Sequence, residues 1–464
     1  MRAELLKKRA LTRMVRLASN LSDEKLIRMV ELSQRHLMRG VTDERVRFTA
    51  EKIKKLFEEK HPATELAKST FRRVSKESRK RIVENFFINA GVTGRQRQEE
   101  LKRELGFGMP WFFVISPTAK CNLKCKGCYA GEYTKSEDLS FELVDRIFTE
   151  AKELGMYFIT ISGGEPYMWP PLLDIFRKHS DMFFQTYTNG TLLTKDMAQK
   201  LAKLGNVAPA ISVEGFEKET DARRGNGVFQ RVMDAMDNLR EAGVVFGYSV
   251  TPTRLNSELL VSDEFVDLMI QKGCVFGWYF QYVPIGRKPD VSLMATPEQR
   301  NYIRQRTKEI RNTKPIFIGD FWNDGPIVGG CLAGARHRGY FHINCKGDVE
   351  PCVFLQFSVD NIKDKKLLDV IQSPFFRAIQ DAQPYCENKN LLTPCALIDN
   401  PRVLRDVVKQ HNARPSYNSS YEVISNPDVC NFLDAYSRDY KKITDPIWEN
   451  EVSLKYQSWK ERFS

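Results

Sequence analysis

The sequence predicts an α/β protein whose centre is a parallel sheet with helices outside it. Strand-like and helix-like segments alternate six times over about 175 residues from Trp111 onward. The polar and sulfur-bearing motifs of this region each fall where a strand-like segment ends. Binding sites in parallel sheets lie at the carboxyl ends of the strands, so the two observations agree. Curling such a sheet gives a partial (βα)6 barrel.

The six units can be placed in order along the chain. The expected strands are residues 111–116, 157–162, 183–188, 207–213, 244–251 and 275–283. The helices expected between them are residues 141–153, 172–179, 195–204, 229–242 and 263–272. At the end of the sixth strand, Gln281 is the polar candidate to face a substrate.

Length and composition predict more than one unit. A chain of 464 residues with 42% hydrophobic residues is long enough for two to four units with a sizeable core. Helical spacing of apolar residues over 5–21 and helix starts at Ser22 and Thr42 predict a helical front. The expected units are a basic helical region, the barrel, a linker, a small α+β domain and a helical tail, over residues 1–108, 109–290, 291–329, 330–400 and 401–464.

Two classes of protein are disfavoured by the sequence. It contains no run of 18 apolar residues, and its first residues lack the apolar core of a signal peptide. We therefore expect neither a membrane span nor export, and predict a cytoplasmic protein. Ten cysteines in such a chain, several at metal-binding spacings, predict reduced thiols and metal ligation rather than disulfides.

All of the excess positive charge lies before the barrel. Residues 1–110 hold 27 Lys and Arg against 15 Asp and Glu, which accounts for the whole net charge of +12. The most basic segment is 71–81. One interpretation is a solvated helix face, because aromatic residues are not interleaved as in nucleic-acid platforms. The other is an amphipathic region that docks on an acidic partner or on anionic lipid, peripheral to the inner membrane face.

Three cysteines, Cys121, Cys125 and Cys128, lie within eight residues on the loop after the first strand. Three thiolates at this spacing can hold three corners of an iron–sulfur cube and leave the fourth iron without a protein ligand. Zinc is the alternative, but zinc sites usually pair cysteines as C-x2-C and use four ligands, and no fourth Cys or His follows closely. The spacing also differs from the C-x2-C-x2-C-x3-C-P run of bacterial ferredoxins.

This C-x3-C-x2-C loop, followed by Ser162-Gly-Gly-Glu-Pro166 after the second strand, resembles the radical S-adenosylmethionine (SAM) superfamily. The resemblance implies a TIM-like partial barrel and a [4Fe-4S] cluster whose free iron chelates the amino and carboxylate groups of SAM. It also implies reductive cleavage of SAM to a 5′-deoxyadenosyl radical, which removes a hydrogen atom from the substrate. Gly127 departs from the family pattern, in which many members have an aromatic residue, and Tyr129 lies just beyond it.

The same resemblance implies which residues contact SAM. In chain order they are Tyr129, Gly163, Gly164, Glu165, Asn189, Ser212, Glu214 and Arg224. The Gly-Gly-Glu backbone and the Glu165 carboxylate are expected to bind the amino group. Ser212 and Glu214, two residues apart on a strand, suit the ribose hydroxyls, and the Arg224 fork suits the carboxylate. Glu214 and Thr220 stand where the family usually has Asp and His.

A second cysteine group follows the barrel. The spacing of Cys331, Gly347 and Cys352 resembles the C-x9-15-G-x4-C pattern of SPASM and twitch domains, which carry auxiliary clusters. Only Cys386 and Cys395 remain of the later SPASM positions, so the resemblance implies a twitch-like domain with one auxiliary [4Fe-4S] cluster on four cysteines. A β-hairpin is expected around Gly347. A zinc ribbon is the alternative, although these gaps are poor zinc-loop spacings.

Other candidate residues have less definite roles. Cys345 is close enough in sequence to be an alternative auxiliary ligand, whereas Cys274 and Cys430 are expected to be buried free thiols. Asp320 and Asp324 are typical turn residues. If they are functional, we expect one of them to act as a base or a substrate contact between the two clusters.

Together these features predict a SAM-dependent radical enzyme, with electron transfer through the auxiliary cluster and an external reductant such as ferredoxin or flavodoxin. The resemblance favours a peptide or protein substrate. A second hypothesis is an enzyme that modifies or couples lipid acyl chains at an anionic membrane surface. A third is a non-catalytic metal-binding protein that binds nucleic acid through residues 1–110, with a steep salt dependence.

Overall fold

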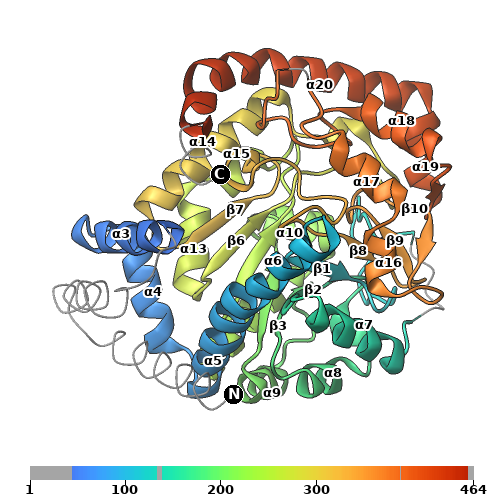
Figure 1. Cartoon of the computed structure of the whole chain (residues 1–464). Helices are drawn as coiled ribbons and strands as arrows, with labels where there is room; N and C mark the ends of the chain where they lie inside the picture. The colour runs from blue at the N-terminus through green and yellow to red at the C-terminus, as the bar shows by residue number, and fades with distance from the viewer. Residues whose placement is uncertain (1–43, 133–137, 387, 458–464) are drawn as a thin grey trace.

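The structure is a computed structural model that describes residues 44–132, 138–386 and 388–457. Its centre is a ten-stranded sheet in the order β11-β9-β8-β1-β2-β3-β4-β5-β6-β7, curled with helices around it (Figure 1). The first seven strands are all parallel and each pairs with the next. They are β1 (Phe112–Ile115), β2 (Phe158–Ile161), β3 (Phe183–Thr188), β4 (Val207–Ser212), β5 (Gly247–Val250), β6 (Phe276–Tyr279) and β7 (Phe317–Asp320). The predicted α/β partial barrel is therefore confirmed.

Capping residues set the limits of the helices between these strands. Hydroxyls of Ser140, Thr194 and Ser262 accept hydrogen bonds from the third backbone N–H of the helices that follow them. Gly205 and Gly273 end two of these helices in the left-handed conformation. The helices of the barrel are α7 (Phe141–Glu153), α8 (Leu172–Lys178), α9 (Lys195–Leu204), α10 (Glu217–Arg224), α11 (Val228–Ala242), α12 (Ser257–Leu260) and α13 (Asp263–Lys272).

The segment 291–329 is not a linker, so that prediction was wrong. It contains α14 (Pro297–Thr313), which starts with a Thr296–Gln299 capping box. It also contains β7, which pairs in parallel with β6 from Phe276 opposite Phe317 to Tyr279 opposite Asp320. The barrel therefore has a seventh strand–helix unit, and the short α15 (Gly325–Val328) follows it.

The predicted hairpin around Gly347 is confirmed, and it extends the barrel sheet. β8 (His342–Ile343) and β9 (Asp348–Glu350) are antiparallel, and β11 (Asp360–Asn361) pairs with β9. β8 also pairs in parallel with β1, through Val114 opposite His342 and Ile115 opposite Ile343. The second cysteine region is thus joined by backbone hydrogen bonds to the strand that leads into the first cysteine loop.

The helical front covers the end of the barrel where the strands begin. It comprises α3 (Glu44–Glu58), α4 (Pro62–Arg73), α5 (Lys76–Arg81), the π-helix η1 (Ile82–Thr93) and α6 (Gly94–Leu105). Val74, Ile82 and Ala90 pack on Phe158 and Phe183, the first residues of β2 and β3. The helix starts predicted at Ser22 and Thr42, and the helical spacing over 5–21, lie outside the described residues.

The basic segment 71–81 contributes to this packing. The Arg73 guanidinium donates to the carbonyl of Gly273, and that of Arg81 donates to the carbonyl of Ser180 at 2.8 Å. Both carbonyls belong to loops that precede barrel strands. Two cationic side chains of this segment therefore hold the helical front on the barrel. Neither the solvated-face interpretation nor the lipid-docking interpretation included this packing role.

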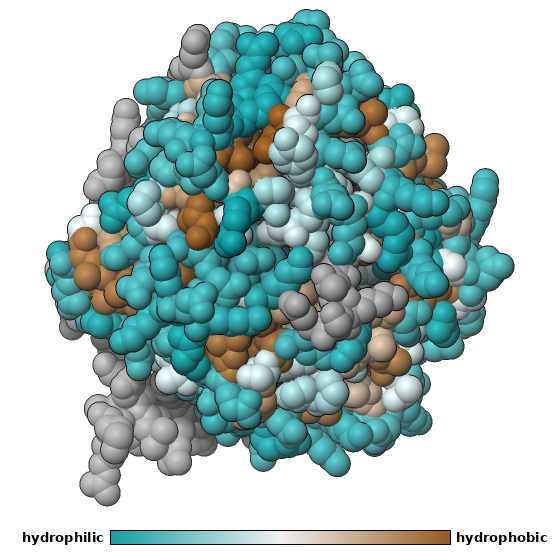
Figure 2. Space-filling model, turned by 90° about the vertical axis from the view of Figure 1, so that its right-hand side faces the viewer, coloured by the Kyte–Doolittle hydropathy of each residue, from teal (hydrophilic) through white to brown (hydrophobic). Residues whose placement is uncertain are grey.

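A layer of helices packs over the second cysteine region and α14. It comprises α16 (Leu367–Ile371), α17 (Pro374–Asp381), α18 (Pro401–Gln410), α19 (Asn418–Ser425), α20 (Pro427–Ile447) and the π-helix η4 (Trp448–Val452). The described part of the C-terminal segment, which the sequence predicted to be helical, contains α18, α19, α20 and η4. It also contains β12 (Arg414–Pro415), which pairs with β10 (Phe357–Ser358). No helix in the described part of the chain is both long and apolar enough to cross a membrane. On the face in Figure 2, apolar side chains form several separate patches on a mostly hydrophilic surface.

Candidate functional site

The first three cysteines lie on the loop that follows β1, at the carboxyl edge of the barrel. All three residues line one hollow together with Gly164 and Arg287. The loop is fixed from two sides: Lys126 N–H donates to the Arg223 carbonyl at 2.9 Å, and Arg287 N–H donates to the Cys128 carbonyl at 3.0 Å. The backbone thus holds three thiols around a shared space.

The Gly-Gly-Glu segment lies directly against this cysteine loop. Gly164 N–H donates to the Thr118 carbonyl at 2.9 Å, and Glu165 N–H donates to the Lys120 carbonyl at 2.7 Å. A Cβ on Gly164 would lie 2.3 Å from the Lys120 carbonyl oxygen, and one on Gly163 would lie 2.5 Å from that of Thr118. Both glycines are therefore required by the close approach of two backbone segments.

The Glu165 side chain is buried and joins the ends of β2 and β3. Its carboxylate accepts hydrogen bonds from the Thr188 hydroxyl at 2.7 Å, Asn189 N–H at 2.8 Å and Tyr167 N–H at 3.2 Å. Burial raises the pKa of Glu165 to about 7, while these hydrogen bonds act in the opposite direction. Three protein donors already use this carboxylate, which the sequence assigned to the SAM amino group.

Glu214 and Arg224 lie together rather than on separate parts of a ligand. Glu214 is buried, and its carboxylate accepts a hydrogen bond from Nε of Arg224 at 3.0 Å. The same carboxylate forms an ion pair with the guanidinium of Arg223. Arg224 Nη1 lies 3.9 Å from the Cys125 sulfur. Ser212, at the end of β4, shares a 3.2 Å hydroxyl contact with Ser249. Glu214 therefore orients two guanidinium groups beside the cysteine hollow.

The other two predicted contacts of this site also lie at its rim. The Tyr129 hydroxyl lies 2.6 Å from that of Ser162, and burial raises the pKa of Tyr129. Asn189 Nδ2 lies 3.8 Å from the Cys121 sulfur. The structure thus brings all the front-site residues predicted from sequence to one edge of the barrel.

The donor set around the front hollow fits an anionic iron–sulfur cluster. Cys121 and Cys125 each have an N–H donor of another residue facing the sulfur, from Asn189 and Arg224. Burial raises the pKa of the Cys121 and Cys128 thiols, so metal binding there would release protons. Among the described residues, no group of three His, Cys, Asp or Glu side chains is close enough to hold a single metal ion. In an iron–sulfur cluster each cysteine binds a different iron, so the three sulfurs lie further apart than around one ion.

Sequence reasoning missed three residues after β6. Gly286 has a φ of +83°, and a Cβ there would lie 2.1 Å from the Cys128 carbonyl oxygen. Arg287 lines the front hollow and donates from Nη1 to the Cys125 carbonyl at 3.1 Å. The ring of Tyr282 lies against Gly127, where a Cβ would meet it at 2.7 Å. The position of Gly286 just after a predicted strand could have indicated a close backbone contact. Nothing in the sequence around Arg287 or Tyr282 indicated a role at the site.

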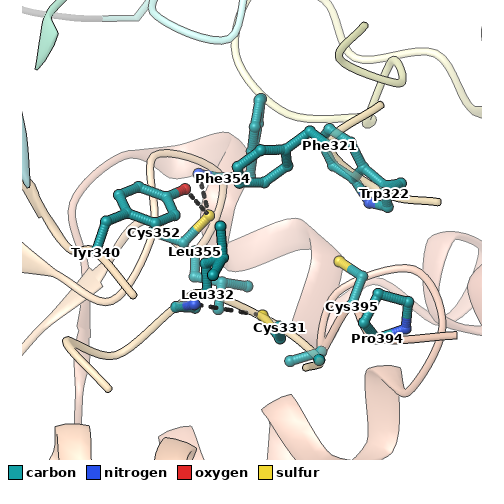
Figure 3. Close-up of a pocket in the computed structure, with 13 residues that line it drawn as sticks. Phe321, Trp322, Cys331, Leu332, Tyr340, Cys352, Phe354, Leu355, Pro394 and Cys395 are labelled. Carbon is teal, nitrogen blue, oxygen red and sulfur yellow. Dashed lines mark hydrogen bonds between the residues drawn. The ribbon is translucent and has the colours of Figure 1, made fainter. Parts of the chain in front are cut away.

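Three cysteines of the second group line a separate hollow (Figure 3). Cys331, Cys352 and Cys395 contribute their sulfurs, and Phe321, Trp322 and Phe354 contribute rings. Each sulfur accepts a backbone N–H from two residues further on, at 3.3 to 3.5 Å. Such N–H groups are typical partners of cluster-bound thiolates. These three residues therefore fit an auxiliary iron–sulfur cluster.

The remaining cysteines lie elsewhere. Cys386 is not among the residues that line the second hollow. Cys345 is buried with Ala119, Ala130 and Tyr417 beside Cys128, on the side of the front site, and it does not line the second hollow either. All ten cysteines are free of disulfides, as predicted. Of the two predicted buried thiols, Cys274 is buried and Cys430 is only partly buried.

Gln281 is buried just after β6, and its Nε2 has no hydrogen-bond partner. An unpaired buried amide group costs free energy. Gln281 lines neither of the two cysteine-containing hollows. Its role as the residue that faces a substrate stays a prediction.

Tyr340 contacts the auxiliary site through its hydroxyl, which lies 2.8 Å from the Cys352 sulfur. Burial raises the pKa of Tyr340 well above its usual value, so the hydroxyl keeps its proton and would donate to the Cys352 thiolate when that thiolate holds a cluster. Hydrogen bonds to thiolate ligands stabilise the reduced, more negative cluster. We expect Tyr340→Phe to lower the midpoint potential of the auxiliary cluster by up to about 40 mV, the limit set by one hydrogen bond of about 1 kcal/mol that strengthens on reduction.

Redox titration followed by electron paramagnetic resonance (EPR) measures this shift. Tyr248→Phe is the matched control, because Tyr248 is also buried but its hydroxyl contacts that of Tyr279 at 3.1 Å. Equal potentials for wild type and Tyr340→Phe would contradict the expected hydrogen bond.

Asp320 lies at the end of β7 and is fully buried. It accepts hydrogen bonds from Asn323 Nδ2 at 2.7 Å and Asn323 N–H at 3.3 Å, and Asp324 lies beside it. Burial, and next the charge of Asp324, raise the pKa of Asp320 to about 6. The ionised form of Asp320 therefore lowers the free energy of unfolding above pH 6. This loss of stability decreases as the pH falls from 6 toward the ordinary pKa of an aspartate.

We expect the unfolding free energy of wild type to rise relative to that of Asp320→Asn by about 1 kcal/mol between pH 7 and pH 5. Urea unfolding of both proteins at several pH values measures the difference. Asp174→Asn, at an exposed ion pair with Arg177, should show no such trend. A pH-independent difference for Asp320→Asn would show that this carboxyl titrates at its ordinary pKa.

The fold and the two sites define a class of protein. A partial parallel barrel, a three-cysteine loop at its carboxyl edge and a second cysteine-lined hollow are the features of a barrel enzyme that works with iron–sulfur clusters. The sequence pattern of the radical SAM superfamily matches residues 115–260, and that of the SPASM iron–sulfur cluster-binding domain matches residues 331–397.

Curated relatives match most of their own length. The AdoMet-dependent heme synthase of Oleidesulfovibrio alaskensis is 27% identical over 348 residues, which is 66% of this chain and 88% of the relative. The mycofactocin maturase MftC of Mycolicibacterium smegmatis is 30% identical over 300 residues, 60% of this chain and 75% of the relative. The chain belongs to the radical SAM superfamily and carries a C-terminal SPASM domain.

A solved structure agrees in fold. SuiB of Streptococcus suis, bound to the precursor peptide SuiA, has a TM-score of 0.52 at 20% identity, over 62% of this chain and 70% of that chain. Membership of the superfamily makes the protein an enzyme that uses a [4Fe-4S] cluster and SAM, and the SPASM domain adds iron–sulfur cluster binding.

Proposed function

We propose that the protein is a radical SAM enzyme that modifies a peptide or protein substrate. The observation that supports catalysis is the hollow shared by Cys121, Cys125 and Cys128 at the carboxyl edge of the barrel. When bound there, the cluster and SAM supply one-electron chemistry that activates a C–H bond. The substrate class rests on the SPASM domain and on the relative named as a maturase.

The residues of the front site have distinct roles in this proposal. The three cysteines hold the cluster. The backbone of Gly163 and Gly164, on the strand-end loop that lies against the cysteine loop, contacts the SAM amino group.

Glu165 fixes that loop to Asn189 through three hydrogen bonds to its carboxylate, and the remaining acceptor position contacts the SAM amino group. Glu214 holds Arg224, whose Nη1 beside Cys125 is left to bind the SAM carboxylate. Ser212 contacts the ribose, Asn189 lies at the pocket edge and Tyr129 contributes its ring to the rim.

The first experiment tests catalysis itself. The protein is reconstituted with iron and sulfide without oxygen, reduced with dithionite and supplied with SAM. We expect 5′-deoxyadenosine and about eight irons per chain, as two [4Fe-4S] clusters require. Intact SAM under these conditions would contradict the proposal. Ferredoxin and flavodoxin, each with its reductase, are then compared as replacements for dithionite.

The second experiment tests the substrate class. A low-molecular-weight peptide fraction from the host should raise the rate of 5′-deoxyadenosine formation, and digestion of the fraction with a broad-specificity protease should abolish the increase. Stimulation that survives the protease would contradict a peptide substrate. Anionic phospholipid vesicles form a parallel arm for the lipid hypothesis.

A tetrapyrrole substrate is a second candidate. Relatives named AdoMet-dependent heme synthase match this chain over 88% of their own length, and another is named Fe-coproporphyrin III synthase. Fe-coproporphyrin III is therefore added as a separate arm of the same assay. Stimulation by this compound alone, with a change in its absorption spectrum, would favour the tetrapyrrole over the peptide.

A further inference from the structure

Three exposed lysines lie on and beside the front cysteine loop. Lys124 and Lys126 stand on either side of its second cysteine, and both are exposed. Lys288, also exposed, follows Arg287, whose backbone N–H donates to the carbonyl of Cys128 at 3.0 Å. These three lysines, which we call the loop lysines, therefore lie beside the front site on the side that faces solvent.

The loop lysines form no ion pair with any residue that the structure describes. Lys120, on the same loop, differs from them, because its ammonium lies 2.7 Å from the Asp138 carboxylate. The exposed acids closest to the loop lysines in the chain, Glu132 and Asp290, accept backbone N–H groups instead. The positive charge of the loop lysines is thus not neutralised by an ion pair.

Basic groups outnumber acidic groups around the front cysteine loop. Besides the loop lysines, Arg223, Arg224 and Arg287 contact this loop through its carbonyl or sulfur atoms. The Glu214 carboxylate, which forms ion pairs with two of these arginines, is buried. The surface around the front site is therefore positively charged.

The basic helical front does not explain this surface. It packs on Phe158 and Phe183, the first residues of β2 and β3, whereas the cysteine loop follows the last residue of β1. The two basic regions therefore lie at opposite ends of the barrel. Residues 1–110 also account for the whole net charge of +12, so the loop lysines are a local excess in an otherwise neutral part of the chain.

The position of the loop lysines points to the entry of electrons. A redox partner cannot approach the front cluster from the barrel side, where the proposed function places SAM and the substrate. It can approach from the solvent side of the cysteine loop, because Lys124 and Lys126 are exposed on either side of a cluster ligand. Redox proteins meet through small, weak interfaces, and opposite charges steer and orient such encounters.

We propose that the loop lysines are the docking surface for the electron donor, and that this donor is a small acidic protein with carboxylates around a one-electron carrier. One electron leaves the reduced carrier and arrives at the front cluster, and no bond forms or breaks. The proposal rests on the proposed function, because it requires a redox cluster at the front site. It adds where the partner docks and which charge the partner presents.

Binding of an acidic flavodoxin, measured by isothermal titration calorimetry, tests the docking surface. The test variant is Lys124→Glu with Lys126→Glu. The matched control is Lys203→Glu with Lys308→Glu, two exposed lysines on α9 and α14 that form no ion pair with a described residue. We expect the Kd at low salt to rise by about tenfold or more in the test variant and by less than about twofold in the control. Lys288→Glu alone should raise the Kd by about threefold.

The salt dependence of binding provides a second readout. Higher ionic strength should weaken flavodoxin binding to wild type and have less effect on the test variant, because salt screens the charges that the variant has lost. Equal Kd values for wild type and the test variant would overturn the proposal. So would a test variant that loses affinity for RNA or anionic vesicles while its affinity for flavodoxin stays unchanged.

Reduction of the front cluster separates docking from catalysis. The rate of its reduction by flavodoxin hydroquinone, followed by rapid-freeze EPR, should fall by about tenfold in the test variant and stay unchanged in the control. Iron content and dithionite-driven formation of 5′-deoxyadenosine should be equal in all variants, because dithionite needs no docking surface. An unchanged rate with flavodoxin in the test variant would overturn the proposal.

Failure of this proposal and failure of the proposed function are distinguishable. If wild type forms no 5′-deoxyadenosine with dithionite, the proposed function is wrong, but calorimetry still decides whether the loop lysines bind the donor. If the two glutamates lower the iron content, Lys124→Gln with Lys126→Gln replaces the test variant in both measurements.

Discussion

Replacement of Gly286 by alanine is expected to remove the front cluster. Gly286 has a φ of +83°, and a Cβ there would lie 2.1 Å from the Cys128 carbonyl oxygen and 2.6 Å from Tyr129 Cα. Both are backbone atoms, so the cysteine loop itself must move. We expect total iron to fall from about eight to about four per chain, and 5′-deoxyadenosine formation to fall by at least 100-fold, because the thiols no longer share one hollow.

Gly227→Ala is the matched control for this experiment. Gly227 also has a left-handed φ, +73°, but a Cβ there meets nothing within 4 Å. It should lose only about 1 kcal/mol of stability from backbone strain and keep all of its iron. Full iron content in Gly286→Ala would show that the cysteine loop is not held by this contact.

Replacement of Arg300 by alanine is expected to lower the free energy of unfolding by about 3 to 5 kcal/mol. Arg300 is fully buried on α14, forms two hydrogen bonds with the Asp399 carboxylate and stacks over Tyr440 with its guanidinium 3.9 Å from the ring centroid. The substitution leaves the Asp399 charge buried without its partner. Because Asp399 also accepts the N–H of Cys395 at 3.0 Å, we expect the auxiliary cluster to bind less iron.

Chemical denaturation and iron analysis measure these two effects. Arg177→Ala, at the exposed pair with Asp174, should change stability by less than about 0.5 kcal/mol. A double variant, Arg300→Met with Asp399→Leu, should recover part of the loss because no unpaired charge remains. A loss below 1 kcal/mol in Arg300→Ala would show that water reaches and solvates Asp399.

The elements that the sequence predicted well are those with a strong local signal. Segments 141–153, 195–204 and 263–272 are predicted with the limits the structure has, because each starts with a hydroxyl cap and has a periodic apolar face. The seventh strand was missed because it has four residues, one of them a glycine, and lies in a segment rich in turn residues. The pairing of β8 with β1 is a long-range contact with no local signal.

The candidate site shows the same division. Cysteine spacing predicted which thiols share the front hollow, because three of them are fixed by one short loop. Spacing did not predict the position of Cys386, which depends on a buried asparagine and on α20. The partners of Glu165 and Glu214 were also unpredictable, since a carboxylate on a strand end gives no sign of whether a ligand or a neighbouring loop will use it.

The hydrogen bonds between β8 and β1 have a mechanical consequence. A chain cut before residue 330 would leave the β1 edge without its partner, and an unpaired edge promotes aggregation. The SPASM region is therefore not a detachable module, and exchanging it between homologues would require carrying the matching edge strand with it. One continuous sheet connects the two cysteine groups, so we expect the distance between them to stay constant when a substrate binds and when a product is released.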